Sequence, residues 1–295
     1  MKPLIIEVPS PLGLRPSGLE RAPDALRAAG LHDQLGGPDV VRISVPDYSS
    51  ERDPASGVLN PDGVAAVARD TADAVAGALD GGRFPVVLGG DCSVMLGGLL
   101  ALRRRGRYGL AFLDGHGDFQ DPADEPNGEV ASLDLAIATG RGPAVLTDLE
   151  GRRPLVRDED VALVGYRVVD DNDHFGDEHV RDTAMTVMDL AEVRDHGTAG
   201  TVGTALAAVA KPGLDGFWVH LDVDVLDDAL VPAVDYRHLG GLSWREAGDI
   251  LGGLLGSGQA RGLEITIFNP ALDPDGSVAA GLAGLIAGAV AHLPG

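Results

Sequence analysis

Three polar side chains alternate with glycines directly after an apolar run, and their types suit a metal ion. Residues 110–113 (LAFL) predict a buried strand of a parallel sheet. Asp114, His116 and Asp118 follow that run, each two residues from the next. Residues two apart point to the same side of an extended chain, so we expect these side chains to converge just beyond the carboxyl end of the strand. Two carboxylates and an imidazole at one point are typical of divalent-cation binding.

A second apolar run ends in the same way. Residues 218–221 (WVHL) predict a strand that leads into Asp222 and Asp224, again two residues apart. Open parallel sheets bind ligands outside the carboxyl ends of their strands, so two such strands side by side would gather four carboxylates and one imidazole in one crevice. Like charges at close range raise each other's pKa values, and two divalent cations would balance them. The pattern therefore predicts a two-metal site.

The composition excludes several classes of protein. The chain has 295 residues, 44% of them hydrophobic, and a net charge of −22. These values are typical of an acidic globular protein with a substantial core, and they argue against a nucleic-acid-binding face, which needs clustered Lys and Arg. Cys92 is the only cysteine, so we expect a reducing, cytoplasmic location. We expect no signal peptide, because the apolar run near the N-terminus is too short for one, and no membrane span, because no apolar run reaches about 18 residues.

Predicted strands alternate with predicted helices along the whole chain, which indicates a parallel sheet covered by helices on both faces. Ser17 and Glu20 have the spacing of a capping box at the start of the first helix, and Ser243 and Glu246 have it before a later one. About eight strands and no convincing linker predict one domain over residues 1–295, although an eight-stranded barrel fits the same alternation. The predicted strands are residues 4–8, 40–45, 84–88, 110–113, 161–164, 185–188, 218–221 and 262–268, and the predicted helices are residues 17–29, 61–79, 93–105, 131–139, 201–210, 243–255 and 278–292.

Three ordered motifs give the chain a recognisable pattern. They are residues 89–93 (GGDCS), 114–118 (DGHGD) and 222–227 (DVDVLD), and residues 18–31 add a fourth segment. With these motifs the chain resembles the ureohydrolase superfamily of arginase, agmatinase and formimidoylglutamase over nearly its whole length. The resemblance implies a three-layer α/β/α domain with a central, mostly parallel sheet of about eight strands, assembled as a trimer or hexamer.

The resemblance also implies a binuclear manganese site, whose bridging hydroxide attacks a guanidinium or related carbon. By position, Asp114 and Asp222 match the ligands that bridge the two ions. His116 and Asp224 match ligands of one ion. Asp118 matches a ligand of the other ion and also hydrogen-bonds the hydroxide, which makes it the candidate catalytic residue.

Cys92 departs from this pattern, because the superfamily usually has His at its position. Manganese prefers hard oxygen and nitrogen donors to a thiolate, and a neutral buried thiol is a poor ligand. Cys92 is thus either a metal ligand or a small core residue. We expect the ion at this position to be weakly bound, absent or softer than manganese. His220 faces the same side as Asp222, either in support of a ligand or as a packed core residue.

The substrate-binding residues of the superfamily are also changed. By position, Ala131 or a neighbouring residue stands where the superfamily has its proton-shuttling His, and Ile267 stands where it has the Glu that binds the guanidinium. Glu264 should face the other side of its strand from Ile267, with Arg261 or another structural partner. Asp170 matches an aspartate that holds the substrate's amino group, unless it belongs to a solvated acidic loop. His238 is assigned no role.

These observations predict a manganese-dependent hydrolase that cleaves a C–N bond of a small molecule. Arginine itself is a poor candidate substrate, so a hydroxyguanidino, formimino or amide compound fits better. The alternative is a homologue that keeps the fold and serves as a binding or assembly subunit without catalysis. Cys92 and Ile267 favour this alternative, whereas the retention of four carboxylates in one place argues against it.

Overall fold

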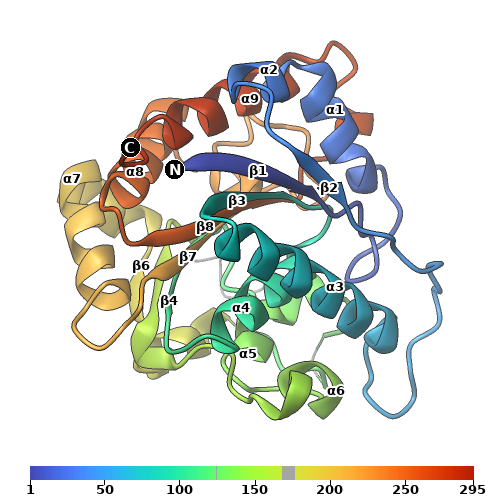
Figure 1. Ribbon diagram of the computed structural model, residues 1–295. Helices are drawn as coiled ribbons and strands as arrows, with labels where there is room; N and C mark the ends of the chain where they lie inside the picture. Colours follow the sequence, from blue (N-terminus) through green and yellow to red (C-terminus); the bar gives the residue numbers. More distant parts are fainter. Residues whose placement is uncertain (124, 168–176) are drawn as a thin grey trace.

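The computed structural model describes residues 1–123, 125–167 and 177–295. Its centre is an eight-stranded sheet in the order β2-β1-β3-β8-β7-β4-β5-β6, with every neighbouring pair parallel (Figure 1). The sheet is open, with β2 and β6 as its edges, so the barrel alternative is wrong. The strands are β1 (Lys2–Glu7), β2 (Val40–Arg42), β3 (Arg83–Leu88), β4 (Gly109–Leu113), β5 (Val161–Val164), β6 (Thr186–Met188), β7 (Phe217–Asp222) and β8 (Ala260–Thr266).

Helices cover both faces of the sheet, which confirms the predicted three-layer α/β/α architecture (Figure 1). One face carries α1 (Ala22–Ala28), α2 (Leu31–Gln34), α7 (Leu190–Val209), α8 (Trp244–Gly256) and α9 (Ser277–Val290). The other face carries α3 (Pro61–Asp80), α4 (Met95–Arg103), α5 (Asp134–Ala138) and α6 (Ala144–Thr147). Buried side chains form one apolar cluster on each face. Within the described part of the chain, no helix has both the length and the apolar character that crossing a membrane requires.

Hydrogen bonds at the helix N-termini show which of the predicted capping boxes is correct and which is wrong. The capping box of Ser243 and Glu246 is present at the start of α8. The predicted box at Ser17 and Glu20 is wrong, because the Ser17 hydroxyl donates to Asp235 at 2.7 Å and a 3-10 turn precedes α1. The predicted strand at 40–45 is shorter, since β2 ends at Arg42.

The predicted helix at 201–210 is only the second half of α7. The helix begins at Leu190, and Asp189 and Glu192 form a capping box there. Gly197 interrupts it with φ 65° and ψ 165°. The interruption shifts the phase of the side chains around the helix, so no single apolar stripe runs through both halves.

A large indole holds the centre of the sheet against the helices. Trp218 on β7 is fully buried between α4 and β8, and two glycines make room for it. A Cβ atom at Gly98 would lie 2.4 Å from the indole, and one at Gly262 would lie 2.1 Å from it. Any side chain at these positions therefore has to displace a buried aromatic ring.

We expect Gly98→Ala to destabilise the protein by about 1–3 kcal/mol through overpacking, although alanine is ordinarily the better helix former by about 1 kcal/mol. Gly284→Ala, in the middle of α9, is the matched control because nothing lies within 4 Å of the added methyl, and it should stabilise. The measurement is the free energy of unfolding in denaturant for both variants. Equal shifts of the same sign would contradict the close packing of Trp218.

Candidate metal centre

The candidate ligands lie at the carboxyl ends of three central strands. In the order β3-β8-β7-β4, the chain segments that follow β3, β7 and β4 meet above one edge of the sheet. Cys92 follows β3, Asp114 follows β4, and Asp222 ends β7. All three are buried. Because parallel strands present their carboxyl ends at the same edge, residues far apart in sequence become neighbours there.

Backbone hydrogen bonds fix the turn that presents Cys92. Buried Asp91 accepts hydrogen bonds from the backbone N–H groups of Gly13 and Ser93, each at 3.0 Å. The N–H of Ile267 donates to the carbonyl of Gly90 at 2.8 Å. Burial raises the pKa of Asp91 to about 6, against the lowering effect of these bonds. Cys92 is thus held from both sides of the turn.

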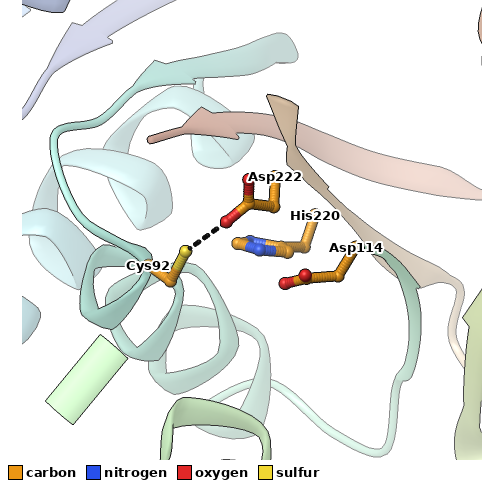
Figure 2. A group of neighbouring side chains, drawn as sticks. All are labelled: Cys92, Asp114, His220 and Asp222. Atoms are coloured by element: carbon orange, nitrogen blue, oxygen red, sulfur yellow. Dashed lines mark hydrogen bonds between the residues drawn. The ribbon is translucent and has the colours of Figure 1, made fainter. Parts of the chain in front are cut away.

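Four buried side chains form the inner group of the site: Cys92, Asp114, His220 and Asp222 (Figure 2). Their ligand atoms all lie within 4.8 Å of one another. The Cys92 thiol donates to Asp222 Oδ2 at 2.9 Å. Burial and then the neighbouring Asp222 carboxylate raise the pKa of Cys92 well above its ordinary value. A cation at this position would favour the thiolate, because metal ligation requires deprotonation.

His116 and Asp224 form an outer group together with Asp114. His116 Nδ1 lies 3.0 Å from Asp224 Oδ2, and the backbone N–H of His116 donates to Asp114 Oδ1 at 2.6 Å. Burial acts to raise the pKa of Asp224, but His116 and Arg167 outweigh it and hold this pKa below its ordinary value. The His116 side chain is 19% exposed whereas Asp114 is fully buried, so the outer group is the side that solvent reaches.

Asp118 and Asp134 form a third group, with Cys92 as the shared member. Asp118 follows β4 and has a left-handed backbone, with φ 46°. The turn breaks the simple alternation that began at Asp114, and Asp118 lies beside Cys92 and Asp134. Asp134, the first residue of α5, is fully buried. Burial and then Asp114 raise its pKa well above the ordinary value.

The electrostatics of the three groups fit bound cations. Burial and mutual repulsion raise the pKa values of Asp114 and Asp222 well above their ordinary range. Asp114 Oδ2 and both Asp134 oxygens are buried without a hydrogen-bond partner among the described residues. A buried carboxylate without a partner costs several kcal/mol. Carboxylate oxygens with an imidazole form a hard donor set, which suits manganese, and Cys92 adds one softer donor.

His220, the imidazole of the inner group, also contacts side chains of β4 and β8. Its ring stacks on Phe112, with centroids 4.6 Å apart, and its Nδ1 lies 3.3 Å from Glu264 Oε1. Trp218 Nε1 donates to Glu264 Oε2 at 3.2 Å. Glu264 therefore packs against β7, on the opposite face from Ile267 as expected. Its partners are Trp218 and His220, and the Arg261 guanidinium instead donates to the backbone carbonyls of Gly258 and Ala260.

The structure brings two further residues to the site that sequence reasoning missed. Arg167 Nη2 donates to the backbone carbonyl of Asp224 at 2.7 Å, and its Nε donates to His238 Nδ1 at 2.6 Å. The His238 ring centroid lies 6.0 Å from that of His116. Arg167 was open to prediction, because it follows the carboxyl end of β5, but His238 lies in a long loop that carries no such signal.

Of the three remaining predicted positions, the structure describes Ala131 and Ile267. Ala131 is nearly buried, and its N–H donates to Gly13 O at 3.0 Å. Ile267 is 5% exposed, belongs to the apolar cluster shared with α1 and α9, and has φ 70°. Positive φ is strained for a β-branched residue. Asp170 lies outside the described residues.

Comparison with known proteins now identifies the family. An open parallel sheet with buried acidic, His and Cys clusters at its carboxyl edge defines a candidate metalloprotein of the α/β class. The sequence model of the arginase family matches residues 2–291, and the chain belongs to this family. Arginase of Bacillus caldovelox is 31% identical over 299 residues, which cover 98% of this chain and 99% of that protein.

Solved structures agree with this assignment. A structure of Bacillus caldovelox arginase superimposes with a TM-score of 0.89 at 28% identity and covers 98% of both chains. Proclavaminate amidino hydrolase from Streptomyces clavuligerus has the same fold, with a TM-score of 0.72 at 18% identity, and covers 99% of this chain and 92% of that one. The family supports a metal-dependent ureohydrolase as the coarse functional class.

We expect Trp218→Phe to destabilise the protein by about 1–3 kcal/mol beyond its packing loss, because it leaves a Glu264 oxygen buried without its donor. Trp244→Phe is the control, since Trp244 is only half-buried and no hydrogen bond from its indole is present among the described contacts. A double-mutant cycle with Glu264→Met isolates the hydrogen bond. Additive effects in the cycle would show that Trp218 does not hold Glu264 beneath His220.

Proposed function

We propose that this protein is a manganese-dependent hydrolase that cleaves a C–N bond in a guanidino, hydroxyguanidino, formimino or amide compound. The observation that carries the proposal is the meeting of buried Asp, His and Cys ligand groups at one sheet edge in a chain of the arginase family. Relatives named as arginases support the reaction class. We also propose a single arginase-like domain over residues 1–295, a cytoplasmic location and a trimer or hexamer.

Each proposed ligand has a stated place. Asp114 and Asp222, which lie innermost, would hold both ions. His116 and Asp224 would hold the ion on the exposed side, and Cys92 with Asp118 the ion on the buried side. When bound, the pair of ions lowers the pKa of a water molecule towards neutrality and makes it a nucleophile.

The protein's own groups would orient the reaction. Asp118 is half-buried and lies beside Cys92, which suits a carboxylate that binds and orients the attacking water. The Arg167 guanidinium holds the loop of Asp224 through a hydrogen bond to the backbone carbonyl of Asp224. His238, held by the same guanidinium, lies beside His116 at the side that solvent reaches.

The residue at the expected guanidinium-binding position is not one that selects a free guanidinium cation. Ile267 places an apolar, nearly buried side chain where the resemblance implies a carboxylate. An apolar side chain does not compensate a buried positive charge, which disfavours arginine and favours a less basic group such as a hydroxyguanidine. Asp170 remains the proposed contact for a substrate amino group. Cys92, Ile267 and the lack of any His at residues 119–167 are the observations that favour the alternative, a binding or assembly subunit without catalysis.

The metal content of the purified protein tests the first part of the proposal. We expect about two manganese ions per chain after loading, since two ions balance the buried carboxylates. Saturation at a hundred times the dissociation constant should stabilise the native state by about 2.7 kcal/mol. Cys92→His, which restores a harder donor, should bind manganese at least as tightly. No metal in either protein, and no thermal shift, would leave only the binding-subunit alternative.

Activity tests the second part. We expect product release from Nω-hydroxyarginine or a formimino compound to exceed that from arginine. Asp118→Asn should lower kcat at least about a hundredfold, the scale of a positioned acid–base group. Asp121→Asn, an exposed neighbour in the same loop, is the matched control and should keep full activity. Turnover of none of these substrates by a protein that carries both ions would contradict the hydrolase assignment.

A further inference from the structure

Asp134 is a buried carboxylate that the proposed ligand set does not explain. It is fully buried at the start of α5, and neither carboxylate oxygen has a hydrogen-bond partner among the described residues. Asp160 shows what compensation looks like at a structural position, since it is equally buried but contacts Arg107 Nε at 2.7 Å and Lys211 Nζ at 2.9 Å. Among the described residues Asp134 has no such cation, so a bound proton or a cation from outside the chain has to neutralise it.

The neighbours of Asp134 indicate what that group is. Its ligand oxygen lies within 4.8 Å of both the Cys92 sulfur and an Asp118 oxygen, and the atoms of these three side chains are mutually within that distance. The three come from different parts of the fold, namely the turn after β3, the loop after β4 and the first turn of α5. Convergence of three donors around one point, two of them buried, is the arrangement of a coordination shell.

We propose that Asp134 is a direct ligand of the ion on the Cys92 side. This inference rests on the proposed function, and it adds a ligand that the resemblance does not imply. The carboxylate supplies a hard oxygen beside the softer sulfur of Cys92, which keeps the donor set suited to manganese. A site with Cys92 as a ligand and without Asp134 would favour zinc or cadmium.

The test is a titration of metal-stripped protein with Mn²⁺ and, separately, with Cd²⁺. We expect Asp134→Asn to weaken the second Mn²⁺ site at least about tenfold, since even groups that only support a ligand contribute this much. The first Mn²⁺ site should be unchanged. Cd²⁺ should lose less affinity than Mn²⁺, because its preferred donor, the Cys92 sulfur, is still present. Asp134→Ala provides a second variant with the same expectation.

Asp160→Asn is the matched control, because it removes a buried carboxylate at the opposite edge of the sheet, ahead of β5. It should destabilise the fold and leave both metal affinities unchanged. An unchanged second Mn²⁺ site in Asp134→Asn would overturn the inference, as would equal losses of Mn²⁺ and Cd²⁺, which indicate structural damage. Failure of both Asp134 variants to fold without metal would also count against it, since removal of a ligand leaves the metal-free fold intact. If the wild-type protein binds no metal, the proposed function fails with it, and this outcome is separate from a loss confined to the variants.

Discussion

Mutual repulsion among buried carboxylates is the constraint that governs this edge of the sheet. Asp114, Asp134, Asp222 and Asp224 are all almost or fully buried, and within a protein interior charges of one sign at such distances are costly. Only Asp224 has its pKa held below the ordinary value, chiefly by His116. The other three have pKa values raised by burial and by one another. To stay ionised together, these carboxylates need positive charge from outside the chain. A divalent ion supplies two positive charges in a small volume.

Backbone N–H groups hold several of these carboxylates in place by hydrogen bonds. N–H groups of His116, Gly115 and Asp224 donate to the carboxylates of Asp114, Asp224 and Asp222, respectively. These donors lie in the turns that end β4 and β7, where peptide groups are no longer needed by the sheet. Hydrogen bonds to a carboxylate favour its charged form. The turns therefore orient the side chains for a cation before any cation binds, which lowers the cost of ordering the site.

The parts of the site that follow apolar strands were open to prediction from the sequence, and the rest were not. Asp114 and Asp222 come directly after buried runs, and parallel strands align their ends, so their meeting follows from local pattern alone. Asp134 lies in a helix reached by a long loop, and nothing in the spacing places it beside Cys92. Likewise, Ser17 fits a capping box by spacing, but a tertiary partner, Asp235, takes its hydroxyl. The predicted helix at 201–210 lacks the first half of α7, because Gly197 shifts the phase of the side chains around the helix. Local rules succeed where the chain meets only its sequence neighbours and fail where a distant segment competes.

The strand order imposes a sequence of events on assembly. β3 and β4 are consecutive in the chain, yet β8 and β7 lie between them in the sheet. The first two hundred residues contain β3 and β4 but neither β7 nor β8. In the native sheet, the places of these two strands form a gap between β3 and β4, whose axes lie about 14 Å apart at the usual spacing. Insertion of β7 and β8 closes that gap and brings Asp222 and Asp224. Such non-local pairing is slow compared with local contacts. The full set of candidate ligands therefore comes together only once β7 has joined the sheet.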